Sequence, residues 1–170
     1  NEGFDVAFNA KVVNARKFKM ELGGSVGHYK NEITKLPEGA TEFTTSMYDG
    51  TILTRVGQAA GMFYGYKTDG VFAKTEDAVA SGKYIMDNTG KKTYFEAGDM
   101  NFVDKDGNGE INDADRFVIG DPNPDIYGNI FANFYFGKRW SVSANFNYSI
   151  GNDIYNFQRY MLEKGSAFMR

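Results

Sequence analysis

The sequence contains no cysteine, one histidine, three prolines and no long run of charge of one sign. Without cysteine the chain can form neither disulfides nor thiolate metal sites. The formal net charge of −3 gives no basic footprint for nucleic acid, so no nucleic-acid partner is expected. The histidine, His28, lies in an alternating strand pattern, and the sequence places no serine or carboxylate to form a triad with it. We therefore expect that the chain is not an enzyme.

Long apolar runs are also missing, since none approaches the ~18 residues that a membrane-spanning helix requires. The chain starts at Asn1 without a charged n-region or an apolar h-region, which is typical of the interior of a longer protein. Aromatic residues make up 16% of the sequence, and 20 residues are glycine. Aromatic side chains fit a pleated strand and glycine supplies positive φ at turns, so the composition favours an all-β fold.

A strict two-residue alternation runs through residues 140–150, WSVSANFNYSI, and continues in residues 127–136, YGNIFANFYF. Only residues 137–139 separate the two runs. Alternation of this kind with a short connection predicts an antiparallel hairpin. In the later run one face would carry Trp140, Val142, Ala144, Phe146, Tyr148 and Ile150, and the other Ser141, Ser143, Asn145, Asn147 and Ser149.

The start of the chain has the same design. Residues 4–13, FDVAFNAKVV, alternate from Phe4 as far as Val12, and residues 18–28, FKMELGGSVGH, alternate again after a short connection at 14–17. The pattern predicts a second antiparallel hairpin.

Two architectures would use such strands. In a soluble β-sandwich the apolar faces pack into one core, whereas in an outer-membrane barrel they meet lipid and the polar faces line a wet lumen. Alternation alone does not separate the two. Strand length, small uncharged polar residues on the inner face, and aromatic residues at both strand ends favour the barrel. The aromatic residues at the strand ends are Tyr135, Phe136 and Trp140 near the short turn, and Tyr127 and Tyr148 at the far end.

The connections between the predicted strands are of very unequal length, because the hairpin turns are short while residues 31–125 form one long excursion. In a barrel that excursion belongs outside the cell. We therefore predict an antiparallel transmembrane β-barrel segment with about four membrane strands in two hairpins. The expected parts are a barrel hairpin at 1–30, an extracellular loop region at 31–125, a barrel hairpin at 126–150 and an extracellular loop at 151–170. Four strands cannot close a barrel, so the chain is expected to be a fragment of a larger barrel domain.

The excursion shows local order of its own. Residues 74–83, KTEDAVASGK, predict a short helix with Thr75 as N-cap and Gly82 at its end. Strand-like aromatic content occurs in residues 61–72 and 91–103.

Residues 104–115, DKDGNGEINDAD, match the order of oxygen ligands in an EF-hand calcium loop. The last position holds aspartate where such loops usually have a bidentate glutamate. The alternative is a turn rich in Asx and glycine that binds nothing. We expect a structural calcium ion rather than a calcium switch, because the flanks are strand-like. Its predicted ligands are Asp104, Asp106, Asn108, the carbonyl group of Glu110, and Asp115.

Three segments together resemble one family: TRVGQAAGMFYGYKTDGVF at 54–72, AGDMNFVDKDGNGEINDADRFVIGDPNPDIYGN at 97–129, and SIGNDIYNFQRYMLE at 149–163. In this order they are similar to the C-terminal half of SusC/RagA-type TonB-linked outer-membrane transporters of Bacteroidetes-like bacteria. The resemblance implies a large barrel with an N-terminal plug in the outer membrane, in contact with its lipid. It also implies TonB-driven import of oligosaccharides or peptides with a SusD-like lipoprotein as lid.

The sequence also suggests residues that could contact a ligand or partner, and it leaves one alternative function open. Phe63, Tyr64 and Tyr66 are candidates for contact with a ligand or partner, although packing within the loop region is the commoner role of such aromatic residues. The alternative function is a soluble calcium-stabilised β-sheet binding or adhesion module, in which the apolar faces would form one core.

Overall fold

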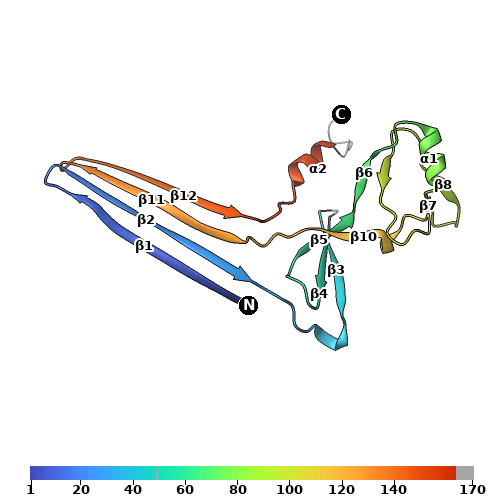
Figure 1. Ribbon diagram of the computed structural model, residues 1–170, viewed down its shortest axis with the longest axis horizontal. Helices are drawn as coiled ribbons and strands as arrows, with labels where there is room; N and C mark the ends of the chain where they lie inside the picture. The colour runs from blue at the N-terminus through green and yellow to red at the C-terminus, as the bar shows by residue number, and fades with distance from the viewer. Residues whose placement is uncertain (49, 164–170) are drawn as a thin grey trace. The chain divides into compact units, whose positions relative to one another are not determined.

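The computed structural model describes residues 1–48 and 50–163 (Figure 1). The described chain forms two compact units. The first comprises Asn1–Phe43, Thr54–Gly61 and the described residues from Asp121 onward, and the second comprises Thr44–Leu53 and Met62–Gly120. The predicted loop at 151–170 is described as far as residue 163, and its remaining part lies outside the described residues.

The first unit is built on one antiparallel sheet whose strand order is β1-β2-β11-β12 (Figure 1). Its strands are β1 (Glu2–Asn14), β2 (Phe18–Lys30), β11 (Ile126–Phe136) and β12 (Trp140–Ile150). Both hairpins predicted from the alternation are therefore present. The same unit holds the 3-10 turn η1 (Pro37–Gly39) and the helix α2 (Phe157–Glu163).

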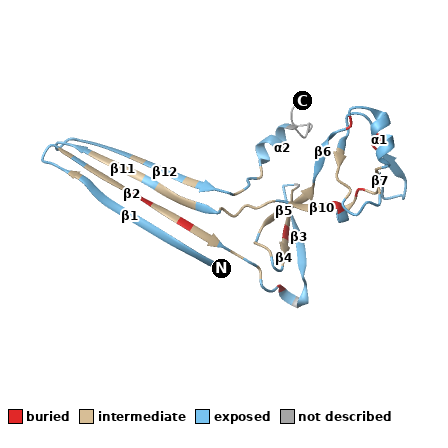
Figure 2. Ribbon diagram, in the orientation of Figure 1, coloured by how far each residue is buried: buried red, intermediate tan, exposed pale blue. Residues whose placement is uncertain are grey.

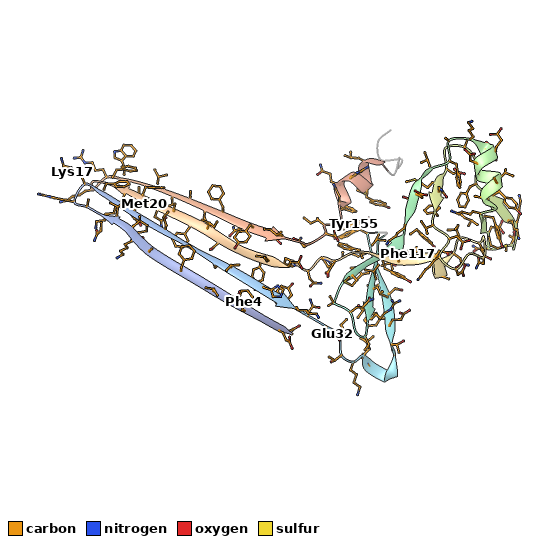
Figure 3. The ribbon with its side chains drawn as sticks, in the orientation of Figure 1. Phe4, Lys17, Met20, Glu32, Phe117 and Tyr155 are labelled. Carbon is orange, nitrogen blue, oxygen red and sulfur yellow. The ribbon has the colours of Figure 1, made fainter. Side chains whose placement is uncertain are left out.

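Both short turns lie at the same end of this sheet, where Figure 3 labels Lys17. The amide of Gly137, between β11 and β12, donates to the carbonyl oxygen of Lys17, between β1 and β2, at 2.7 Å. Gly137 has a φ of +61°, which glycine adopts without strain. The long excursion leaves β2 and returns to β11 at the opposite end, and these two strands are neighbours, paired from Phe18 opposite Phe136 to Gly27 opposite Tyr127.

The alternation predicted through Val12 is interrupted there. Lys11 lies opposite Glu21 and Val13 opposite Met20, so Val12 is the extra residue of a β-bulge. A bulge lets the strand bend and twist more strongly next to its turn, and the two-residue period therefore does not continue to the strand's end.

The second unit contains most of a four-stranded sheet in the order β10-β5-β4-β3 and two small two-stranded sheets, β6-β9 and β7-β8. The larger sheet consists of β3 (Glu42–Met47), β4 (Gly50–Arg55), β5 (Met62–Tyr66) and β10 (Arg116–Gly120). The smaller pairs are β6 (Thr68–Val71) with β9 (Met100–Phe102) and β7 (Tyr84–Met86) with β8 (Lys92–Tyr94). The unit also holds the helix α1 (Thr75–Ser81) and the 3-10 turn η2 (Asp113–Asp115).

A small core holds these pieces of the second unit together. Phe72, Ala78, Phe95 and Ile111 are buried in it. The ring of Phe102 packs 5.9 Å from that of Phe95, centroid to centroid. Burial of these side chains explains why so short a helix as α1 forms, since packing rather than intrinsic propensity stabilises most protein helices.

The predicted N-cap of α1 is wrong by one residue. Lys74 occupies the N-cap position with extended backbone and no side-chain cap, and Thr75 is the first helical residue. The hydroxyl oxygen of Thr75 instead accepts a hydrogen bond from the amide of Ala97, at 3.4 Å, in a distant segment of the chain. Gly82 ends the helix in the left-handed region, with a φ of +67°.

Candidate functional site: a two-faced sheet and a carboxylate loop

The sheet of the first unit has one apolar face, because its register brings the apolar positions of all four strands together. Val6 lies opposite Val26 on β2, and Ile130 on β11 lies opposite Phe146 on β12. Figure 2 shows β1 and β12 almost wholly exposed. Large side chains of this face on β2 are half-buried. Those that are 54% to 76% exposed lie on β1, β11 and β12, namely Phe4, Val6, Phe8, Ile130, Trp140, Val142, Phe146 and Ile150. The single shared core expected of a soluble module is therefore not formed by these side chains.

The opposite face of this sheet is lined mainly by amides and hydroxyls. Its members include Asp5, Asn9, Ser25, Asn129, Asn133, Ser141, Ser143, Asn145, Asn147 and Ser149. The Ser25 hydroxyl donates to Oδ1 of Asn129 across the pairing of β2 with β11, at 3.1 Å. An apolar face and an amide-rich face on strands of this length are the pattern of a barrel wall between lipid and water.

Three glycines missed by the sequence reasoning let aromatic side chains approach the backbone of this sheet closely. A Cβ on Gly23 would come 2.3 Å from Cζ of Phe131, and one on Gly27 would come 2.6 Å from Cζ of Tyr127. Tyr127 then reaches over β2 and donates its hydroxyl proton to Oδ1 of Asp5 on β1, at 3.0 Å. On the apolar face a Cβ on Gly128 would meet the hydroxyl oxygen of Tyr148 at 2.7 Å. The sequence feature that could have identified these contacts is glycine inside an otherwise regular strand pattern, which often indicates that another group approaches the backbone closely.

A network of hydrogen bonds around Asn123 and Asp121 joins several segments of the first unit, beyond the end of the strands where the long excursion begins. The side chain of Asn123 accepts from Nδ2 of Asn31 at 2.9 Å and donates to the carbonyl oxygen of Ala60 at 3.0 Å. The amide of Asp121 donates to Oδ2 of Asp153 at 2.9 Å, and the amide of Asp153 donates back to the Asp121 carbonyl at 2.7 Å. The GQAAG, DPNPD and GNDIYN stretches, far apart in the sequence, thus meet in one place.

The second unit carries the loop predicted to bind calcium. Asp104, Asp106 and Asp115 each present a carboxylate oxygen, and these three atoms lie within 4.8 Å of one another. Gly107 and Gly109 have φ values of +73° and +82°, so the chain doubles back between the carboxylates as only glycine does readily. Hard oxygen donors that converge in this way suit calcium.

Hydrogen bonds within the loop fix these side chains. Asp104 accepts from the amides of Gly107 and Gly109, each at 2.7 Å. Partial burial opposes ionisation of Asp104, but the hydrogen bonds from Gly109 and Gly107 outweigh it, and the pKa of this carboxyl lies below its ordinary value. Asn108 accepts from the amide of Glu110 at 2.6 Å, and its carbonyl oxygen keeps a second lone pair.

Asp115, at the last position of the loop, is fully buried. Within the described part of the chain, its two oxygens accept backbone hydrogen bonds, from Lys105 at 2.8 Å and from Asn112 at 2.9 Å. A buried carboxylate without a cationic partner is costly, so a bound cation would complete its environment. The donor set therefore fits calcium, and occupancy by the metal stays a prediction.

The loop is attached to a neighbouring hairpin. The amide of Tyr84 on β7 donates to the carbonyl oxygen of Gly109 at 2.9 Å, and the amide of Ile111 donates to the carbonyl oxygen of Tyr84 at 2.8 Å. Ile111, the apolar residue of the loop, is 6% exposed. The loop is thereby anchored on one side to β7 and on the other to the core of the second unit.

The three aromatic candidates for ligand contact lie on β5. Tyr66 packs edge-on against Phe102 at 5.6 Å, and its hydroxyl donates to Asp113 at 3.3 Å. Phe63 and Tyr64 are half-buried. Tyr66 thus has a packing role, and ligand contact by any of the three stays a prediction.

Among the described residues, no helix is both long and apolar enough to cross a membrane.

Comparison with known proteins finds no matching family model. A curated relative, TonB-dependent receptor P3 of Formosa agariphila, is 31% identical over 172 residues, which cover 98% of this chain and 16% of the relative. TonB-dependent receptor SusC of Bacteroides thetaiotaomicron is 25% identical, with 91% of this chain and 14% of SusC covered. These relatives are named as receptors, not as enzymes.

Among solved structures, that of the RagAB peptide transporter matches 97% of this chain and 17% of the matched chain, with a TM-score of 0.56 and 20% identity. This likeness shows a common fold. The chain spans about a sixth of the length of the proteins that it matches. Over nearly its whole length, the chain is thus similar to one segment of the SusC/RagA-type TonB-dependent receptors of the bacterial outer membrane.

Proposed function

We propose that the chain is a wall segment, with its outer loops, of a TonB-dependent outer-membrane importer of nutrients such as oligosaccharides or peptides. In this proposal the importer works with a SusD-like surface lipoprotein, and the TonB complex acts through parts of the receptor outside this chain. The chain contributes four adjacent membrane strands and the loop region between β2 and β11.

The two-faced sheet is the single observation that carries this proposal. Its apolar face is exposed on β1, β11 and β12 and half-buried on β2, while its other face presents amides and hydroxyls. Both short turns lie at one end and the long connection leaves from the other, as expected if the turns are periplasmic and the excursion is extracellular. The named relatives, TonB-dependent receptors, support the same assignment.

One candidate cargo is supported by the name of a similar protein. The matched structure is that of a peptide transporter, which supports peptides as one candidate cargo. The aromatic residues Phe63, Tyr64 and Tyr66 remain candidates for contact with cargo or lipoprotein, and Tyr66 also packs against Phe102.

Calcium has a structural role in this proposal. The ion would be held by Asp104, Asp106, Asn108, the carbonyl group of Glu110, and Asp115, and would neutralise their shared negative charge. Because the loop is bound to Tyr84, holding the loop also holds the β7-β8 hairpin. Outer loops meet extracellular fluid, where even a site with a dissociation constant of ~10⁻⁴–10⁻³ M is filled.

A depth-resolved labelling experiment tests the membrane assignment. Single spin labels at Val142, Ala144 and Phe146, and at Ser143 and Asn145, are placed in the full-length receptor reconstituted in bilayers. We expect oxygen to reach the even positions and a polar relaxant to reach the odd ones. Equal shielding of both sets would mean that the apolar face is a protein core, and the soluble calcium-stabilised module would replace the importer.

A further inference from the structure

The carboxylate loop, residues 104–115, contains Asn108 followed by Gly109, the only Asn-Gly dipeptide in the sequence. In such a dipeptide the backbone nitrogen of glycine attacks Cγ of asparagine, because no side chain hinders it. The new nitrogen–carbon bond forms, the bond from Cγ to Nδ2 breaks, and ammonia leaves with the proton given up by the glycine nitrogen. Water then opens the succinimide ring at either carbonyl and gives aspartate or isoaspartate. Water is the only co-reactant.

We propose that Asn108 is a deamidation site and that the folded loop protects it, so that the reaction proceeds only when the loop opens. The argument has three parts, which concern the attacking nitrogen, the carboxamide that it attacks, and the backbone on either side.

The attacking nitrogen is already engaged. The N–H of Gly109 donates to Oδ2 of Asp104 at 2.7 Å. Attack requires that this nitrogen turn away from Asp104 and give up its proton, so the hydrogen bond to Asp104 must break before the ring can close.

The carboxamide of Asn108 is held at both of its ends. Its oxygen accepts from the amide of Glu110 at 2.6 Å, and its nitrogen donates to Oδ2 of Asp106 at 2.9 Å. Rotation toward the glycine nitrogen would break both hydrogen bonds, and each of them stabilises a folded chain by about 1 kcal/mol or more.

The backbone around the dipeptide is fixed as well. The carbonyl oxygen of Gly109 accepts from the amide of Tyr84 at 2.9 Å, and the amide of Ile111 donates to the carbonyl of Tyr84 at 2.8 Å. Closing the succinimide ring requires the chain at 108–109 to turn, which would break this attachment to β7. Isoaspartate would add one carbon to the main chain at this point and move Gly109 out of register with Tyr84. An aspartate product would add a further carboxylate to the loop.

The test measures the deamidation rate of Asn108 by peptide mapping with isoaspartate detection in the full-length receptor in detergent, at neutral pH, in calcium and in chelator. A synthetic peptide of residues 100–118 gives the rate for an open chain. A loop that is open about a tenth of the time or less reacts about tenfold or more slowly than the peptide, and we expect at least this ratio in both solutions. Equal rates for receptor and peptide, or protection in calcium alone, would overturn the proposal.

Two variants identify the group responsible. Asp104→Ala removes the acceptor of the Gly109 amide, and we expect its rate to rise several-fold toward that of the peptide. Asp99→Ala is the matched control, because Asp99 accepts from the amide of Glu96 at 2.8 Å in another turn of the same unit. An unchanged rate in Asp104→Ala, or an equal rise in Asp99→Ala, would show that Asp104 does not protect the site.

Discussion

An arginine at the centre of β12 should be costly on one face and tolerated on the other. The strand has 11 residues, which at ~3.3 Å per residue and a tilt of ~45° span about 25 Å of bilayer, the height of the apolar band of such barrels. Its centre is Asn145, so in a β12 that spans the membrane Ala144 would lie within one residue of the bilayer midplane and Ile150 would lie at the edge of the apolar band. A cation on the lipid face costs about 2–4 kcal/mol at the midplane and about 0–1 near the interface.

We therefore expect Ala144→Arg to lower the free energy of unfolding by about 2–4 kcal/mol, Ile150→Arg by about 1 or less, and Asn145→Arg by little, because it points to the wet face. A loss of 2–4 kcal/mol changes the folded-to-unfolded ratio roughly 30-fold to 900-fold. The assay is urea titration of the full-length receptor refolding into lipid vesicles. Equal losses for Ala144→Arg and Asn145→Arg would refute the reasoning, because depth and face would then have no effect.

Three further predictions follow from contacts in the two units. Asp106→Ala should weaken calcium binding by about tenfold or more, since affinity follows the number of charged ligands; calorimetric titration measures it, and an unchanged affinity would place the ion elsewhere. Gly23→Ala should destabilise the sheet by about 1–3 kcal/mol through overpacking against Phe131, and Phe131→Ala in the same chain should recover part of the loss in urea titration. Thr89→Val should raise the pKa of Asp87 back toward its ordinary range, because the Thr89 hydroxyl is the largest of the hydrogen bonds that lower it; carboxyl titration by NMR would show no change if the reasoning is wrong.

The pH dependence of the Asp87 turn follows from the sign of that shift. A pKa lowered in the folded state means that the ionised carboxylate stabilises the turn. This stability is present above the carboxyl's ordinary pKa and is lost as the pH falls through the lowered value. Amide exchange at Lys91, whose N–H donates to Asp87 at 2.9 Å, should therefore gain protection between acid and neutral pH, and less so in Thr89→Val.

The two hairpins could be predicted from the sequence because their signal is local. From Trp140 to Ile150 every second residue is apolar, and the strand has these same bounds. The bulge at Val12 could not be predicted, since it depends on how β1 fits its turn and neighbour. Thr75 was mistaken for an N-cap because its contact with Ala97 comes from a distant segment.

Pairing between segments that are far apart in the sequence also could not be predicted from it. Nothing in the period of β2 or β11 says that these strands are neighbours, although Gly23 and Gly27 are the places where rings from β11 lie. The order of ligands in the carboxylate loop could be predicted because it is written in twelve consecutive positions. The hydrogen-bond network around Asn123 could not be predicted, because its partners Asn31 and Ala60 come from other parts of the chain.

The adjacency of β2 and β11 has a consequence for how such proteins diversify. Gly27 lies directly opposite Tyr127, so the two ends of the excursion are held side by side by the sheet itself, whatever lies between them. Closing a loop whose ends are already fixed costs little more as the loop grows. The region at 31–125 can therefore be lengthened, shortened or grafted from one receptor to another without altering the register of the wall. Under the proposed function, such exchange would alter the outer surface of the importer and leave its membrane wall unchanged.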